Sequence, residues 1–249
     1  MPLSEFYADL HIHTVLSPCA ELEMGAPEII GKARETGIHL IAVTDHNACA
    51  NVKALQEASE NCNGPVVLAG MEVQTAEDIH VVLIFPDLGV AEEYQAWLRK
   101  GFMKISNRPE VFGYQLVIDK DNNVIEEIEP LLIQGVSYVI DEVISKAKDL
   151  NAIVILAHID RPSFSYPAVL GPIPAALDVD ALEISPRLSV AKTIDLKESY
   201  PSRTLVRSSD SHELKSIDRN NCCRVLIASP CFSELSLALH SEKGRKVLL

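Results

Sequence analysis

Asp9-Leu-His-Ile-His-Thr14 follows the first aliphatic stretch of the chain and contains two histidines, His11 and His13, that are two positions apart. In an extended strand, residues i and i+2 project to the same side, so both imidazoles can reach one metal ion. Four more histidines lie beside short aliphatic or β-branched stretches: His46, His80, His158 and His212. Side chains at the carboxyl ends of parallel strands converge in a β/α barrel. The pattern therefore indicates a multinuclear metalloenzyme.

The hydrophobic pattern alternates short strands with amphipathic helices, which is typical of α/β proteins built from β/α units. The predicted strands are 5–10, 38–44, 65–72, 79–85, 152–157, 179–184 and 203–208, and 223–228 is a candidate for one more, peripheral strand. The predicted helices are 26–36, 50–60, 90–103, 138–150, 189–198 and 233–243. A length of 249 residues is usual for one β/α barrel. We therefore predict a single barrel domain over residues 1–249.

One segment, residues 86–137, interrupts the alternation between the fourth and fifth strands. It contains the predicted helix 90–103, and residues 113–128 read as a β-hairpin around a turn-rich loop. We predict a small helix-hairpin insertion there. Two interpretations stay open: the insertion caps the mouth of the site, or it decorates the surface.

Composition limits the classes of function. The formal net charge of −13 argues against broad binding to nucleic acids or anionic membranes. No stretch approaches the roughly 18 apolar residues of a membrane helix, and the N-terminus lacks the pattern of a signal peptide. The six cysteines form no CxxC pair and no disulfide framework. We expect a cytoplasmic protein with reduced thiols, no membrane partner and no extended nucleic-acid binding.

Two carboxylates accompany the histidines. Asp210 and His212 repeat the i, i+2 spacing after the last predicted strand, and Glu72 ends the strand Val-Val-Leu-Ala-Gly-Met-Glu. A carboxylate has two oxygens and can bridge two metals. We also expect His80 and His158 each to close a strand. So many polar groups at matching strand ends are hard to explain by core packing, because an unpaired buried polar group costs several kcal/mol (~2–7). His39 and His240 lie at other positions, and we expect them to be structural or exposed.

The motifs of this chain, and their order along it, resemble those of the PHP family, the polymerase and histidinol phosphatase superfamily. They are Asp9–Thr14 with Ser17, Thr44–Asn47, Glu72 with His80, His158, and Ser209–His212. The resemblance spans almost the whole chain and is typical of a complete single-domain member. It implies a distorted, TIM-like seven-stranded barrel, in agreement with the seven strands predicted above. It also implies a site for two or three divalent metal ions.

The resemblance further implies a distribution of ligands. His11, His13, Glu72 and Asp210 would hold the first metal, Glu72 would bridge to a second metal held by His80 and His158, and His46 with His212 would hold a third. Many family members have one more histidine where this chain has Cys19. A thiolate is a good ligand for zinc or iron, so we predict that Cys19 substitutes for it, although Cys19 could also be a bystander. Histidine and carboxylate ligands suit zinc, manganese and iron alike.

The expected activity is hydrolysis of a phosphate monoester by a metal-activated hydroxide. Divalent metals lower the pKa of bound water and neutralise charge on phosphoryl oxygens. The substrate would be a small phosphorylated metabolite such as histidinol phosphate or a nucleotide. Asp210 or a ligand histidine would manage the proton, and Glu72 would hold the metals. Arg161 and Arg187 follow predicted strands and are candidates for contacts with the phosphate.

Three other functions stay open. The first is a phosphodiesterase or 3′–5′ exonuclease acting on short oligonucleotides. The second is a metal-binding regulatory module without turnover, against which the nearly complete ligand set argues. The third is an amidohydrolase-type deaminase, which we rank low because strands three to five contain no lysine to bridge metals. The sequence alone does not indicate an oligomeric state.

Overall fold

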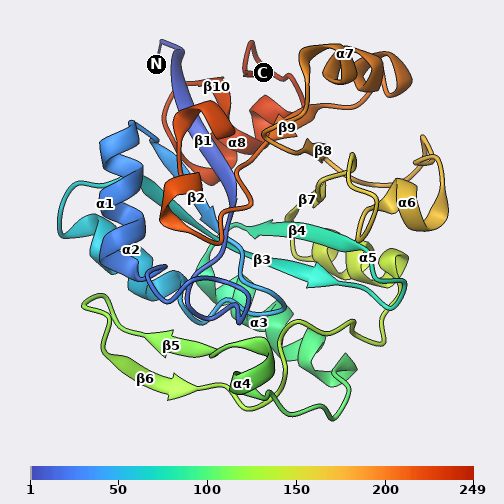
Figure 1. The fold of residues 1–249 in the computed structure, drawn as a ribbon. Helices are drawn as coiled ribbons and strands as arrows, with labels where there is room; N and C mark the ends of the chain where they lie inside the picture. The colour runs from blue at the N-terminus through green and yellow to red at the C-terminus, as the bar shows by residue number, and fades with distance from the viewer. Residues whose placement is uncertain (1) are drawn as a thin grey trace.

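The computed structural model describes residues 2–249, and its main feature is a curved sheet surrounded by helices (Figure 1). The order of strands in this sheet is β11-β10-β1-β2-β3-β4-β7-β8-β9. The strands are β1 (Ser4–Ile12), β2 (Leu40–Val43), β3 (Val66–Gln74), β4 (His80–Phe85), β7 (Ile153–Leu156), β8 (Ala181–Ile184), β9 (Leu205–Arg207), β10 (Cys223–Ile227) and β11 (Lys246–Leu248). An isolated parallel bridge between Ile12 and Ser211 brings the end that follows β9 back to β1. The sheet is therefore a nearly closed barrel.

The barrel-like α/β architecture confirms the predicted class, but the number of strands differs. In the described residues the main sheet has nine strands rather than seven. The seven predicted strands correspond to β1, β2, β3, β4, β7, β8 and β9. The two others join at one edge, where β10 pairs antiparallel with the first half of β1 and β11 pairs antiparallel with β10. Segment 223–228 is thus the predicted peripheral strand, whereas β11 was not predicted.

Strand β4 runs against its neighbours. It pairs antiparallel with β3 and with β7, while the β1–β2, β2–β3, β7–β8 and β8–β9 pairs are parallel. The prediction that His80 closes a strand is wrong, because His80 is the first residue of β4 and pairs with Gln74 at the end of β3. The reversal puts the first residue of β4 at the same edge as the carboxyl ends of the parallel strands. His80 therefore reaches the predicted site by another route.

Helices flank the sheet (Figure 1). They are α1 (Ala26–Thr36), α2 (Val52–Glu60), α3 (Leu88–Leu98), α5 (Ile140–Asp149), α7 (Val190–Ser199) and α8 (Phe232–Leu239), with the short helices α4 (Pro109–Phe112) and α6 (Tyr166–Leu170). Helix α8 packs with Leu10 and Val82 in a different core from the one that contains the buried residues of α1, α2, α3 and α5. Helix α1 has Pro27 in its first turn and ends at Gly37, whose φ of 74° allows its N–H to reach the carbonyls of Ala33 and Arg34. Among residues 2–249, no helix is both long and apolar enough to cross a bilayer.

The segment between β4 and β7 contains α3, α4 and a separate two-stranded sheet of β5 (Leu116–Ile118) and β6 (Val124–Glu127). Helix α3 packs against the barrel through Tyr94. The centroid of its ring lies 5.2 Å from that of Phe85, and its hydroxyl donates a hydrogen bond to the carbonyl of Val143. The β5–β6 hairpin lies below the loops that follow β1 and β2 in Figure 1. It therefore packs outside the barrel sheet.

Candidate metal centre

The imidazoles of His11 and His13 meet at the end of β1. Both residues are fully buried, and their Nε2 atoms are 3.1 Å apart. The Oδ1 atom of Asp210 lies 3.3 Å from the first of these nitrogens and 3.2 Å from the second. The two imidazoles therefore lie on the same side of the chain, as their i, i+2 spacing predicted. The carboxylate of Asp210, which follows β9, lies beside both.

Glu72 occupies the centre of the cluster. It lies inside β3, two residues before the end of the strand, and is 1 % exposed. Its Oε1 is 2.9 Å from Nδ1 of His80 and 3.4 Å from Nε2 of His158, and its Oε2 is 3.0 Å from Nδ1 of His46. One carboxylate thus joins both sides of the cluster, as a bridging ligand must.

The spacing of these atoms fits divalent metals. Four ligands held tetrahedrally at about 2.1 Å lie about 3.4 Å from one another. Oε1 of Glu72 is 3.4 Å from Nε2 of His11, and Oε2 is 3.4 Å from Nε2 of His13. Three groups of compatible ligand atoms form in the described residues: His11 with His13 and Glu72, His46 with Glu72 and His80, and His13 with His46 and His212. The unpaired buried nitrogens of His80 and His158 are Nε2 and Nδ1, which are not the atoms nearest Glu72. In contrast, Nδ1 of His46, Oε1 of Glu72 and Oδ1 of Asp210 face the cluster and also lack a hydrogen-bond partner. Such atoms are costly unless a ligand satisfies them.

Neighbouring side chains orient the imidazoles. A carboxylate only accepts, so Nδ1 of His11 donates to Glu183, with Nδ1–Oε2 at 3.0 Å, and Nε2 keeps its lone pair for the cluster. Nδ1 of His13 lies 2.9 Å from Oγ of Ser17, and this hydroxyl donates to Oδ1 of Asp45. Asp45 therefore supports a candidate ligand through Ser17.

The sequence interpretation missed Glu183. Its side chain is 1 % exposed in the middle of β8, and besides His11 it accepts a hydrogen bond from the backbone N–H of His158. It therefore holds two candidate ligands from different strands. A glutamate within the buried stretch Ala-Leu-Glu-Ile, residues 181–184, was the signal that could have revealed it.

Electrostatics divides the histidines into two sets. Burial alone would lower the pKa of His13, but the carboxylates of Asp210 and Glu72, at 3.2 and 3.4 Å from its Nε2, outweigh burial and raise the pKa to about 9. Burial lowers the pKa of His46 to about 4, and burial together with the charge of His13 lowers the pKa of His212 to about 3. The surrounding histidines hold the pKa of Glu72 well below its usual range despite burial. Without metal, His13 is protonated at neutral pH, while His46 and His212 are neutral.

Left-handed backbone conformations occur where the site needs sharp turns. Asn47, His158 and Asp210 have φ of 51°, 29° and 49°. Each such non-glycine residue costs about 1–3 kcal/mol, and such strain concentrates at functional sites. Asn47 is held by its side-chain amide, which donates to the carbonyls of Leu132 and Gln134. The strain re-aims the chain directly beside the candidate ligands.

A cavity of about 150 Å³ opens over the cluster. It is lined by His46, Glu72, His80, His158, Arg161, Ser163, Phe164, Asp210 and His212. Nη1 of Arg161 is 2.7 Å from Oδ2 of Asp210, so this predicted arginine lies on the cavity but is paired with a carboxylate. Arg187 is exposed and does not line the cavity, so it stays outside the proposed site.

Cys19 lies outside the three ligand groups. The residue is exposed, but the protein around its thiol raises the pKa to about 12, first by desolvation and then through the negative charge of Glu72. A thiol with such a pKa remains protonated at neutral pH in the metal-free protein. The geometry gives no support to Cys19 as a ligand, and its role stays a prediction.

The insertion supports the site from outside. None of the cavity-lining residues comes from segment 86–137. Instead, the N–H of Leu116 donates to the carbonyl of Val15, and Asn51 donates to both Thr14 and the carbonyl of Leu116. Gly113 lies so close to the carbonyl of Pro18 that a Cβ at this position would clash with it. The hairpin therefore contacts and stabilises the loop that follows His13. The interpretation that the insertion caps the cavity finds no support in the lining residues.

The comparisons with known proteins agree with this geometry. The family model of the PHP domain matches residues 9–159, which is more than half of the chain. The chain belongs to the PHP family. This membership makes it a metal-dependent hydrolase, as the motifs predicted. No curated protein matches the sequence.

Solved structures share the fold at low identity. The lesion-specific endonuclease Q of Pyrococcus furiosus superposes with a TM-score of 0.72 at 19% identity over 99% of this chain and 58% of that chain. Endonuclease Q in complex with a 27-mer duplex that carries an abasic lesion at the active site gives a TM-score of 0.66 at 19% identity over 98% of this chain and 58% of that chain. A protein of Bifidobacterium adolescentis assigned as a metal-dependent phosphoesterase gives 0.54 at 18% identity over 82% and 87%. The chain thus spans less than two thirds of endonuclease Q.

Proposed function

We propose that this PHP protein hydrolyses phosphodiester bonds in nucleic acids with the help of two or three divalent metal ions. The observation that carries the proposal is Glu72, which joins candidate ligands from both sides of the barrel at the floor of an open cavity. A metal cluster with one open side suits phosphoryl hydrolysis, because it can bind the phosphoryl oxygens and activate a water.

The residues of the cluster have separate tasks in this proposal. His11, His13 and Asp210 would hold one metal, His80 and His158 a second, and His46 with His212 a third, with Glu72 as a shared ligand. When bound, the metals polarise the phosphoryl group and lower the pKa of water. Glu183 and Ser17 keep the Nδ1 atoms of His11 and His13 occupied, so that each Nε2 faces Glu72 and Asp210 in the cluster. Arg161 lies at the rim, where its guanidinium can contact a phosphoryl oxygen.

The charge of the cavity supports a diester over a monoester. Among its described lining residues, Arg161 alone carries a permanent positive charge, and Asp210 already pairs with it. A monoester dianion gains from additional cations, whereas a diester carries one negative charge. The structural likeness to endonuclease Q supports the same choice. The expectation against extended nucleic-acid binding rested on a net charge of −13 and on the small number of aromatic residues, and both describe the whole chain rather than this cavity.

A phosphate monoester of a small metabolite is the second candidate. The cavity volume of about 150 Å³ favours it, because ordinary ligand pockets measure about 300–1,000 Å³. A bare phosphoryl group fits such a space more easily than a folded nucleic acid does. The sugar and base of a polymer would have to lie outside the cavity.

Cleavage assays on purified, metal-analysed protein test the proposal. We expect zinc, manganese or iron to support cleavage of labelled oligonucleotides, with little phosphate release from small monoesters. The matched control is Glu72→Gln, which keeps the shape of the side chain and removes its charge. Phosphate release from monoesters without cleavage of any oligonucleotide would reverse the order of the two candidates.

A further inference from the structure

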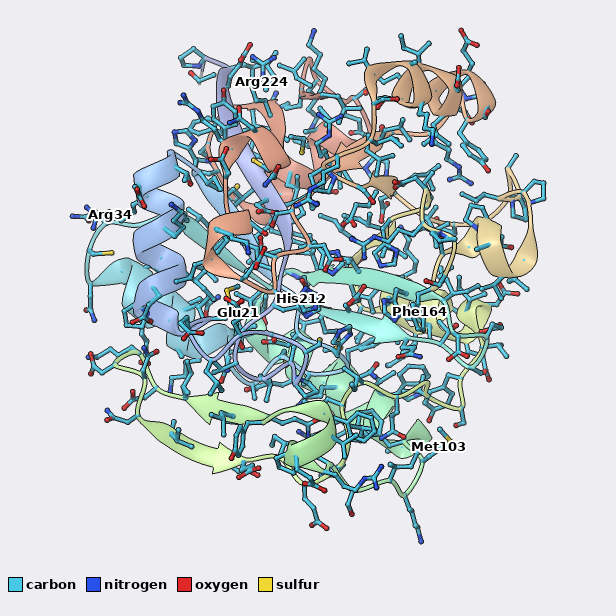
Figure 2. The ribbon with its side chains drawn as sticks, viewed as in Figure 1. Glu21, Arg34, Met103, Phe164, His212 and Arg224 are labelled. Atoms are coloured by element: carbon cyan, nitrogen blue, oxygen red, sulfur yellow. The ribbon has the colours of Figure 1, made fainter. Side chains whose placement is uncertain are left out.

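Phe164 is an exposed aromatic residue on the rim of the cavity. It is 42% exposed, and it lines the cavity together with Arg161 and Ser163 from the same loop. Its ring stacks on the imidazole of His80 with centroids 4.7 Å apart and an interplanar angle of 25°. Figure 2 labels Phe164 and His212 in the central part of the molecule. One face of the ring therefore covers a candidate metal ligand, and the exposure belongs to the rest of the ring.

The chain holds Phe164 there against its backbone preference. Its φ is 56°, a left-handed conformation that is uncommon for a bulky residue. The carbonyl of Phe164 accepts a hydrogen bond of 2.9 Å from the N–H of His80. The hydroxyl of Ser165 donates to the carbonyl of Arg161 at 2.7 Å and closes the turn. A strained backbone that presents an apolar ring to solvent gains nothing for the core, which points to a binding role.

The position of the ring relates it to the proposed chemistry. The imidazole of His80 lies between Phe164 and the cluster, and its Nδ1 is 2.9 Å from Oε1 of Glu72. A group stacked on the open face of Phe164 would therefore lie on the side of the ring away from Glu72, beside the cavity that Phe164 lines. Tyr114, the other exposed aromatic among the large hydrophobic side chains of residues 2–249, does not line this cavity.

We propose that the open face of Phe164 is a stacking platform for the nucleobase next to the scissile phosphate. Every nucleobase has a π face, so stacking on an aromatic ring tolerates many sequences and serves a single-stranded or unpaired nucleotide. Arg161 in the same loop would lie on the side of the phosphate. This inference rests on the proposed function, and it adds that the substrate is recognised through an unstacked base.

The test compares two substrates with the same backbone. One is a short single-stranded oligonucleotide, and the other replaces every nucleotide by an abasic spacer. The ratio of the two kcat/KM values should fall about fivefold or more in Phe164→Ala, the factor that stacking on one base contributes at least. Phe164→Tyr should restore the ratio. Phe164→Leu, which still covers His80 with apolar atoms, should not. Tyr114→Ala is the control outside the cavity, and it should leave both values unchanged.

A binding measurement supplies a readout without turnover. Titration calorimetry should give weaker binding of a 5′-mononucleotide to Phe164→Ala than to the wild type, with equal binding of ribose 5-phosphate. An unchanged ratio of kcat/KM in protein that cleaves both backbones would overturn the platform and leave the proposed function standing. An equal loss on both substrates would assign Phe164 to the support of His80 alone. If the wild type cleaves neither backbone, the proposed function fails and the platform fails with it.

Discussion

The surface of this protein has two hollows, and the smaller one contains the candidate metal ligands. The cavity over the histidines measures about 150 Å³, and a groove on the insertion measures about 830 Å³. The groove is lined by residues 99–106 and 126–132, among them the exposed Met103, which Figure 2 labels far from His212. Volume alone would select the groove.

Unsatisfied polar atoms distinguish the two hollows. Nine buried side-chain atoms lack a hydrogen-bond partner in the described residues, and five of them belong to residues that line the small cavity. None belongs to a residue that lines the groove. A buried polar atom without a partner is costly, so a fold retains it where a ligand satisfies it. The comparison teaches that residues with unpaired buried polar atoms gather around the small cavity and not around the groove.

The largest expected effect on activity comes from removing one carboxylate charge from the small cavity, compared with the same change in the groove. Glu72→Gln should reduce activity more than about 1,000-fold, because it removes the carboxylate that joins both sides of the cluster, and metals contribute several kcal/mol. Elemental analysis should find fewer metals per chain. Glu127→Gln in the groove is the matched control and should change kcat/KM less than about twofold. Equal losses in both variants would break the comparison.

The second prediction concerns the buried support beneath the cavity. Glu183→Gln should lower metal affinity or activity about 10–100-fold, the usual cost of losing a carboxylate that orients a ligand histidine. Competition with a chromophoric chelator measures the affinity. Thermal unfolding of the metal-free variant provides the control. Full metal affinity in the variant would show that His11 keeps its orientation without Glu183.

The next prediction concerns competition between protons and metal ions for the histidines of the cluster. The pKa of His13 is raised to about 9, so at neutral pH metal must displace its proton. Burial lowers the pKa of His11, but the charges of Glu183, Asp210 and Glu72 outweigh it and raise this pKa well above its usual value, so His11 also has a proton to displace. Metal affinity should therefore rise with pH, by about tenfold per unit for each proton displaced. His46 and His212, with pKa values of about 4 and about 3, add no such dependence near neutrality. Chelator competition at about pH 7 and about pH 8 checks the slope, and a flat profile would contradict the assignment.

The two arginines test the rim of the cavity. Arg161→Gln should reduce kcat/KM about tenfold or more, because a hydrogen bond between charged groups contributes about 1.5–3 kcal/mol. Arg187 does not line the cavity, so Arg187→Gln should have the kcat/KM of the wild type. Steady-state kinetics on one oligonucleotide compares them. A larger loss in Arg187→Gln would return that residue to the site and show that the substrate extends beyond the cavity.

The smallest effect is expected for Cys19. Its thiol lies outside the three ligand groups, so Cys19→Ser should keep the metal content and change activity less than about twofold. Metal analysis and kinetics on the same preparation decide the point. The loss of one metal per chain would show that Cys19 is a ligand and that the loop carrying it closes around metal.

Much of the site followed from local patterns. The i, i+2 spacing of His11 and His13 fixes their common side, and both lie in the cluster with Glu72 and Asp210. The ranges of α1 and of the seven main strands also agree closely with hydrophobic periodicity, which depends on neighbours in sequence. The strand β11 was missed because its three residues carry too short a pattern.

By itself, the sequence determined the α/β alternation, the six histidines with their carboxylates, and membership of a metal-dependent hydrolase family, because these depend on residue types and short spacings. Only the tertiary structure decided the direction of β4, the support of His11 by Glu183 and the exclusion of Arg187 from the cavity. Residues 11 and 183 are far apart in the chain. Their contact depends on which strands pair and in which direction, and no local period carries that information.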